Sequence, residues 1–88
     1  MVHFLSKEFV FKSFKKFFDK EKSNLKNNTV REIDLNDDRF LELIRYMMNG
    51  FVVGEINIKI TMTENPNEFF VREIKDISVY KNLMIITW

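Results

Sequence analysis

Apolar residues recur at helical spacing near the N-terminus of this chain and at alternate positions toward its C-terminus. Between residues 6 and 22 they fall within about a 120° arc of a helical wheel, the width of a core-facing stripe. Ser6 is a suitable N-cap residue for such a helix. The stripe consists of Val10, Phe11, Phe14, Phe17 and Phe18. The spacing therefore predicts a first helix over residues 6–22.

Lysines occupy the side of this predicted helix that faces away from the stripe. They recur every four residues, and we expect Phe9 to point outward among them. These lysines are Lys12, Lys16 and Lys20. A strand is the alternative for the sequence EFVFKSF, because phenylalanine and valine favour sheets. We prefer the helix, because the stripe has the helical period.

A second helix is predicted over residues 36–49, where both ends carry sequence signals. Asn36 is a suitable N-cap residue, and Leu35 and Phe40 have the spacing of a hydrophobic staple. Gly50 follows the segment as a stop signal. The predicted apolar face consists of Phe40, Leu43, Ile44, Met47 and Met48.

From residue 52 onward the period of the pattern changes to two, which is typical of half-buried antiparallel strands. The sequence ENPNE predicts a turn around Pro66. Residues 69–76 are compatible with a strand or with a short helix. The clearest alternation is that of Ile56, Ile58, Ile60 and Met62.

The end of the chain predicts a β-hairpin. We expect a two-residue loop at Lys81 and Asn82. Such a loop would align apolar residues on one face of the two strands, and Trp88 would extend that face. The expected pairs are Val79 with Met84 and Ile77 with Ile86.

Together these elements predict an α+β fold. Two N-terminal helices would pack on one face of a three-stranded antiparallel sheet near the C-terminus, a β-meander over residues 52–88. The 88 residues would form a single small α+β domain over 1–88. Most of the phenylalanines would join the first helix to the sheet, and burying each would contribute roughly 1.5–3 kcal/mol.

Composition argues against several kinds of chemistry. The chain has no cysteine, so a catalytic thiol is excluded, and its two glycines cannot form a glycine-rich phosphate loop. Asp34, Asn36 and Asp38 match the first three ligand positions of a calcium-binding EF-hand loop. Arginine, however, occupies the positions that require glycine and the bidentate glutamate. We therefore expect no enzymatic activity, no metal and no cofactor.

Charge is distributed unevenly along the chain, although the net charge is only +1. Residues 1–28 carry seven lysines against three acidic residues, a net charge of +4, whereas residues 29–88 carry a net charge of −3. This asymmetry can steer a charged partner, and outward aromatic residues can anchor it. The residues predicted to bind a partner are Phe9, Lys12, Lys16 and Lys20, with Lys59 and Tyr80 on the open sheet face.

These features predict a small non-enzymatic binding protein that occupies a surface of a host protein or ribonucleoprotein. The chain has no alanine and is rich in lysine, asparagine, isoleucine and phenylalanine, as AT-rich coding would give. We therefore expect a phage or mobile-element inhibitor or regulator, anti-CRISPR-like in role. The mechanism would be steric.

Other functions remain open at this point. A small RNA- or DNA-binding protein could use the same lysines, with weak and salt-sensitive affinity. A homodimer could form through the last strand, LMIITW, if that strand is a sheet edge. Membrane binding by the first helix is disfavoured, because freeing that helix would expose the apolar sheet face. No apolar run approaches the roughly 20 residues of a membrane span, and we expect a cytoplasmic location.

Overall fold

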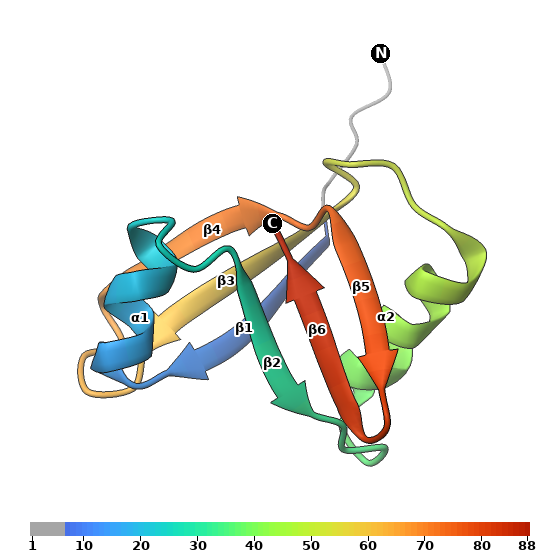
Figure 1. The fold of residues 1–88 in the computed structure, drawn as a ribbon, viewed down its shortest axis with the longest axis horizontal. Coiled ribbons are helices and arrows are strands. Elements are labelled where there is room, and N and C mark those ends of the chain that lie inside the picture. The colour runs from blue at the N-terminus through green and yellow to red at the C-terminus, as the bar shows by residue number, and fades with distance from the viewer. Residues whose placement is uncertain (1–6) are drawn as a thin grey trace.

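The computed structural model of this chain describes residues 7–88, which form six strands and two helices (Figure 1). The helices are α1 (Lys15–Lys22) and α2 (Asp38–Asn49). The strands are β1 (Lys7–Ser13), β2 (Asn28–Glu32), β3 (Ile56–Met62), β4 (Phe69–Glu73), β5 (Asp76–Tyr80) and β6 (Leu83–Thr87).

The strands form two three-stranded sheets instead of one. The first sheet has the order β1-β3-β4, with β1 parallel to β3 and β4 antiparallel to it. The second sheet has the order β2-β6-β5, and both of its pairings are antiparallel. The α+β class is confirmed. The predicted packing of two N-terminal helices on one face of a single C-terminal sheet is wrong, because β1 and β2 add strands from the first half of the chain.

The predicted helix over residues 6–22 is wrong for most of its length. Residues 7–13 form strand β1 and only residues 15–22 are helical, while residue 6 lies outside the described residues. Alternate residues of a strand face the same side, so Phe9 and Phe11 both point inward, where each is 3% exposed. Parallel pairing with β3 supplies the main-chain hydrogen bonds that a helix would have made internally.

Helix α1 buries only part of the predicted stripe. Phe18 is fully buried, whereas Phe17 is exposed, and Phe14 occupies the N-cap position with an extended backbone and is 61% exposed. Of the five stripe residues only Phe11 and Phe18 are buried. The stripe therefore does not form one continuous core-facing surface.

Helix α2 begins two residues later than predicted. Its N-cap residue is Asp37 and not Asn36, and the Asp37 side chain accepts a hydrogen bond from the main-chain N–H of Arg39. The predicted hydrophobic staple does not form, because Leu35 is exposed. The predicted end is confirmed: Gly50 follows with a φ of 81°, in the left-handed region that favours glycine.

The C-terminal half follows the predicted pattern closely. Strand β3 buries every second residue, and residues 69–73 form a strand, not a helix. A turn over residues 63–68 joins β3 to β4 around the predicted Pro66. The β5–β6 hairpin has the predicted loop, and its predicted cross-strand pairs are confirmed: Val79 with Met84 and Ile77 with Ile86.

Strand β6 is the central strand of the second sheet. It pairs with β2 on one side and with β5 on the other. The expectation that the last strand is a free edge is therefore wrong, and the proposed homodimer through that strand loses its basis. Within residues 7–88 the edge strands of this sheet are β2 and β5, each of which pairs with β6 alone.

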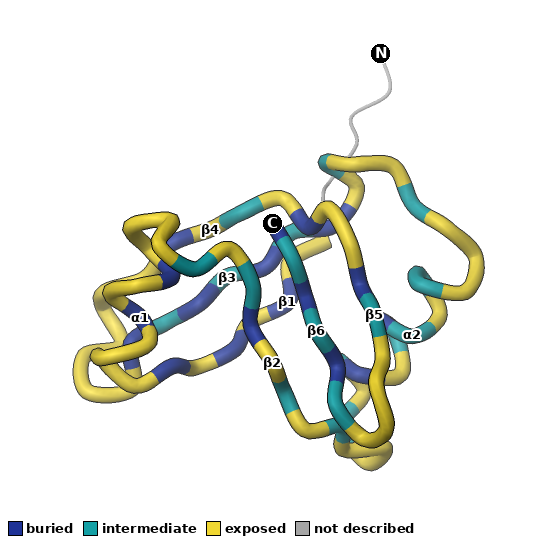
Figure 2. Tube along the Cα trace, viewed as in Figure 1, coloured by how far each residue is buried: buried dark blue, intermediate teal, exposed yellow. Residues whose placement is uncertain are grey.

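The two sheets share one core, and their strands cross in Figure 1. Buried residues alternate with less buried ones along β3 and β6 (Figure 2). The Phe70 ring links the layers, because its centroid lies 5.3 Å from that of Phe18 and 6.0 Å from that of Trp88. Neither helix in residues 7–88 is long and apolar enough to cross a membrane.

Candidate functional site

A cleft of about 290 Å³ opens between α1 and β2. We call it the cationic cleft, because Lys12 and Lys26 are part of its lining. Residues 12–26 carry six lysines against two acidic residues, so the surface around the cleft is strongly positive. The helix side of the cleft carries Phe14, Phe17 and Glu21, and the strand side carries Thr29, Val30 and Arg31.

The guanidinium of Arg31 is held in place by three hydrogen bonds. It donates from Nε to Thr29 Oγ1 at 2.9 Å, from Nη2 to Ser13 Oγ at 2.8 Å, and from Nη1 to the main-chain oxygen of Lys12 at 2.5 Å. Burial lowers the pKa of Arg31 from its ordinary value, although the nearby Glu21 charge acts in the opposite direction. The arginine therefore joins β2 to the end of β1.

Glu21 is the most unusual residue of the cleft. It is only 1% exposed, and its Oε1 atom has no hydrogen-bond partner among the described residues. Charged residues are rarely buried so completely, and an unsatisfied buried polar group costs roughly 1–3 kcal/mol or more when it is charged. The lining of the cleft thus includes a residue with a strong hydrogen-bond acceptor that no residue of 7–88 uses.

The two phenylalanine rings of the cleft differ in their surroundings. The ammonium groups of Lys16 and Lys26 lie 4.9 Å and 5.5 Å from the centroid of the Phe17 ring, as in cation–π contacts. Phe14 is more exposed and also borders an open hollow on the other side of α1's first turn, lined by Lys15, Lys16, Asp19 and Glu64. Exposed aromatic rings among positive charges are typical of a binding surface.

The structure brings together only part of the predicted partner-binding set. Lys12 lines the cationic cleft, Lys16 lies against Phe17, and Lys20 is exposed on α1. The three lysines do not share one helix face, because Lys12 belongs to β1. Phe9 was expected to point outward, and this is wrong: it is buried, and its ring packs edge-on against Tyr46 at 6.3 Å.

Lys59 and Tyr80 do not form a common platform. Lys59 lies on β3 in the first sheet, where its ammonium is 4.2 Å from the centroid of the Phe69 ring. Tyr80 ends β5 in the second sheet and is 63% exposed. The prediction of one open sheet face carrying both residues is wrong, because their strands belong to different sheets.

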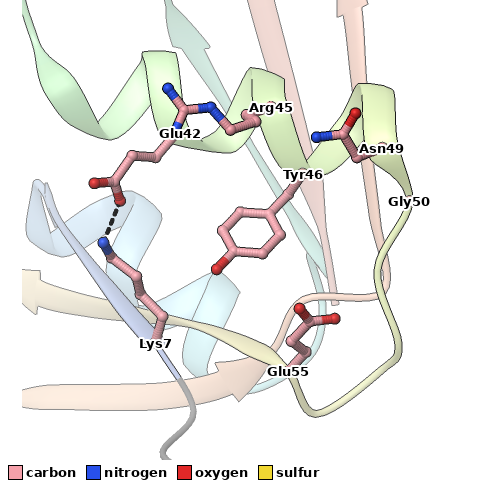
Figure 3. A pocket seen from close by; sticks show the side chains of 7 residues that line it. All are labelled: Lys7, Glu42, Arg45, Tyr46, Asn49, Gly50 and Glu55. Atoms are coloured by element: carbon pink, nitrogen blue, oxygen red, sulfur yellow. Dashed lines mark ion pairs between the residues drawn. The ribbon is translucent and has the colours of Figure 1, made fainter.

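A second hollow, of about 340 Å³, lies between the start of β1 and the later part of α2 (Figure 3). Lys7 and Glu42 form an ion pair of 2.5 Å there, and Tyr46 reaches into the space between Lys7 and Glu55. The walls carry both signs of charge, and their carboxylate and ammonium groups are partly paired. We therefore regard the cationic cleft as the stronger candidate site.

Sequence reasoning missed Phe14, Phe17 and Glu21 as site residues. The signal available for the two phenylalanines was the alternation that begins at Phe9 and Phe11, which indicates a strand ending near residue 13. A helix that starts after this strand would not place all five stripe residues in the core. The burial of Glu21 has no comparable signal, because it depends on where β2 passes α1.

Comparison with known proteins does not identify the site. No model of a known protein family matches this chain, and no curated protein matches it. Within residues 7–88, His, Cys, Asp and Glu side chains do not gather into a group of three or more that could hold a metal ion. The function must be inferred from the cleft and its surroundings.

Proposed function

We propose that this chain is a small non-enzymatic binding protein whose working surface is the cationic cleft. The observation that carries the proposal is the exposure of Phe14 and Phe17 beside Lys12, Lys16 and Lys26. Covering a large aromatic side chain contributes roughly 1.5–3 kcal/mol. A partner that buries both rings therefore gains substantial affinity, and the lysines attract an acidic one.

The chemistry of the cleft supports binding more than catalysis. Arg31 is engaged in three hydrogen bonds, and among the described residues Glu21 is the one carboxylate in the lining. General acid–base catalysis needs a group that can reach a substrate and exchange a proton with it near neutral pH. A fixed arginine and a recessed carboxylate suit recognition of a ligand better.

The setting that we propose is a phage or mobile element, where the protein would inhibit or regulate a host protein or ribonucleoprotein in the cytoplasm. Its action would be steric and anti-CRISPR-like in role. The support for this setting is the amino-acid composition, and the support for a steric action is the dense cluster of cations and aromatic rings on one side of the molecule.

The proposal can be tested by affinity capture from the native host with matched variants. The double variant F14A/F17A should reduce recovery of the partner about tenfold or more, as expected for hot-spot residues. Tyr80→Ala is the matched control, because Tyr80 is 63% exposed and Phe14 is 61% exposed. Equal loss in both variants, or no loss in F14A/F17A, would contradict a working surface at the cleft.

The second candidate is a small RNA- or DNA-binding protein, which the six lysines of residues 12–26 favour. Its binding should weaken steeply with salt, by about 0.7–0.9 in the logarithm of the affinity per phosphate and per decade of salt. A protein partner anchored on the phenylalanines should respond much less. Capture with and without nuclease separates the two, and Lys16→Glu with Lys20→Glu should abolish nucleic-acid binding.

A further inference from the structure

At β1, arginine side chains cover the outer edge of the first sheet. In the parallel pairing with β3 the main-chain groups of Phe9 and Phe11 point toward β3, so those of Val10 and Lys12 point outward. The outward oxygen of Lys12 accepts a hydrogen bond from Arg31, and that of Val10 accepts one from Arg39. An incoming strand would have to displace both guanidinium groups.

The outer edge of β4 is also partly covered. On β4, the main-chain oxygen of Val71 accepts a hydrogen bond of 2.9 Å from Arg72 Nη1. Nη2 of the same arginine donates to the main-chain oxygen of Lys22 in α1. In the second sheet, helix α2 packs against β5, the other edge strand (Figure 1). Natural sheets commonly protect their edges in such ways, because an open edge can pair with another chain.

The edge of β2 has no such protection. In the antiparallel pair of β2 and β6, every second residue of β2 makes main-chain hydrogen bonds to β6. At the two ends of the pair, the N–H of Trp88 donates to the main-chain oxygen of Asn27, and the N–H of Ile33 donates to that of Asn82. The alternation leaves the N–H and C=O groups of three residues facing outward. These residues are Asn28, Val30 and Glu32, and within residues 7–88 no side chain hydrogen-bonds to their outward main-chain groups.

This open edge borders the cationic cleft, because Val30 is part of the cleft lining. Glu21 also lines the cleft, and its buried Oε1 atom is an acceptor without a partner in the described part of the chain. An acceptor of this kind is satisfied when a ligand donates an N–H or O–H to it. The edge therefore offers a ligand main-chain hydrogen bonds, and the cleft offers one bond to a side chain.

Charge narrows the chemistry of that ligand. The positive charges of Lys12, Lys26 and Arg31 disfavour a cationic side chain in the cleft, and the Glu21 carboxylate disfavours an anionic one at its base. A neutral donor such as an indole N–H, a phenol or a side-chain amide satisfies both conditions. The lysines outside the cleft favour acidic residues on either side of that donor.

We infer that an extended segment of a partner protein adds to the open edge of β2 and inserts one neutral donor side chain into the cationic cleft, where Glu21 accepts its hydrogen bond. Acidic residues flank the inserted side chain. In strand addition, main-chain bonds supply affinity and side-chain pockets supply specificity. The inference rests on the proposed function and specifies its partner and its geometry.

A library of displayed random dodecapeptides provides the probe, with the full chain as the immobilised target. Selected peptides should share one Trp, Tyr, Asn or Gln with acidic neighbours. Glu21→Met should weaken their binding about tenfold to a hundredfold, as expected for a hydrogen bond to a charged group. Glu21→Gln, which keeps a carbonyl acceptor, should restore part of the loss.

Strand addition itself is tested on the peptide and on β2. Methylating the peptide amides that face β2 should abolish binding, whereas methylating the alternate amides should have little effect. Val30→Pro should also abolish binding, because it removes an outward N–H that the partner strand would need. The fold should tolerate this change, because proline is accepted on an edge strand where the N–H faces away from the sheet. If that variant does not fold, hydrogen exchange replaces it: the Val30 amide should become protected when the peptide binds to the unaltered chain.

Each other outcome has a definite meaning. The inference is overturned if the library yields no enriched peptide, or if the enriched peptides bind equally well to Val30→Pro and Glu21→Met. It is also overturned if RNA or DNA 20-mers bind with a steep salt dependence that Lys16→Glu removes. The proposed function fails separately, when F14A/F17A leaves the captured partner unchanged.

Discussion

Phe14 and Phe18 are only four positions apart, yet one ring is exposed and the other is fully buried. Phe18→Ala should lower the free energy of unfolding by about 3–5 kcal/mol, because it leaves a cavity beside Phe70. Phe14→Ala should change it by no more than about 0.5 kcal/mol. Urea denaturation measures both values. Similar losses in the two variants would mean that Phe14 belongs to the core and not to a binding surface.

Asp37 gives the start of α2 a dependence on pH. Hydrogen bonds from the Arg39 guanidinium hold the pKa of Asp37 below its ordinary value of 3.8. The stabilisation is therefore complete above about pH 5, roughly one unit above the ordinary pKa, and is lost as the pH falls through the lower pKa of the folded state. Asp37→Asn keeps an N-cap residue but should remove this part of the acid-induced loss of stability.

Thermal unfolding followed by circular dichroism between pH 2 and pH 6 checks this prediction. Asp38→Asn serves as the control, because it leaves the pair of Asp37 and Arg39 intact. That variant should lose stability at low pH as the unaltered chain does. If Asp37→Asn has the same acid profile as the control, the pair does not contribute to the pH dependence.

At the scale of the element, the β5–β6 hairpin contains a backbone conformation that suits glycine better than lysine. Lys81 has a φ of 56°, in the left-handed region where a side chain costs roughly 1–2 kcal/mol. Lys81→Gly should therefore raise the free energy of unfolding by up to about 1 kcal/mol, after the extra chain entropy of glycine is subtracted. Asn82→Gly, at a position without positive φ, should bring no gain in the same urea measurement.

The elements that sequence predicted well are those whose contacts are local. The β5–β6 hairpin, including its register, depends on residues within twelve positions of each other, and β3 has an alternation that no helix would produce. The ends of α2 were nearly right because capping is a property of a few adjacent residues. In each case the physical cause lies within the segment itself.

The first segment was predicted wrongly because its sequence satisfies two periods. Phe9 and Phe11 alternate as in a strand, while Phe11, Phe14 and Phe18 recur as in a helix. The choice depends on β3, whose paired residues lie 49 positions further along, from Lys7 with Ile56 onward. The cationic cleft could not be predicted for the same reason: lysines on the surface were foreseeable, but the meeting of α1 with β2 was not.

At the scale of the whole molecule, the two sheets should unfold together. Trp88 is the only tryptophan, and it is buried where its ring meets Phe70 of the first sheet. Its fluorescence therefore reports contact between the sheets, whereas far-ultraviolet circular dichroism reports the strands and helices themselves. The two urea transitions should coincide, as in a two-state domain. A fluorescence change at lower urea would show that the sheets separate before they melt.

Phe70→Leu provides a control for that experiment. Phe70 contacts both Phe18 and Trp88, so the smaller side chain should move the midpoint to lower urea concentrations. The shift should be equal for both probes if the core is shared. A shift confined to the fluorescence signal would contradict a single cooperative core.

The parallel pairing of β1 with β3 also has a consequence for folding during synthesis on the ribosome. A nascent chain that stops short of residue 62 lacks part of the strand against which β1 lies, so Phe9 and Phe11 remain unshielded while some fifty further residues are translated. Such long-range pairing is slow to form. Until it forms, the exposed apolar residues of β1 can bind chaperones or aggregate. Newly made copies should therefore become protease-resistant only after residues 7–88 have emerged from the ribosome.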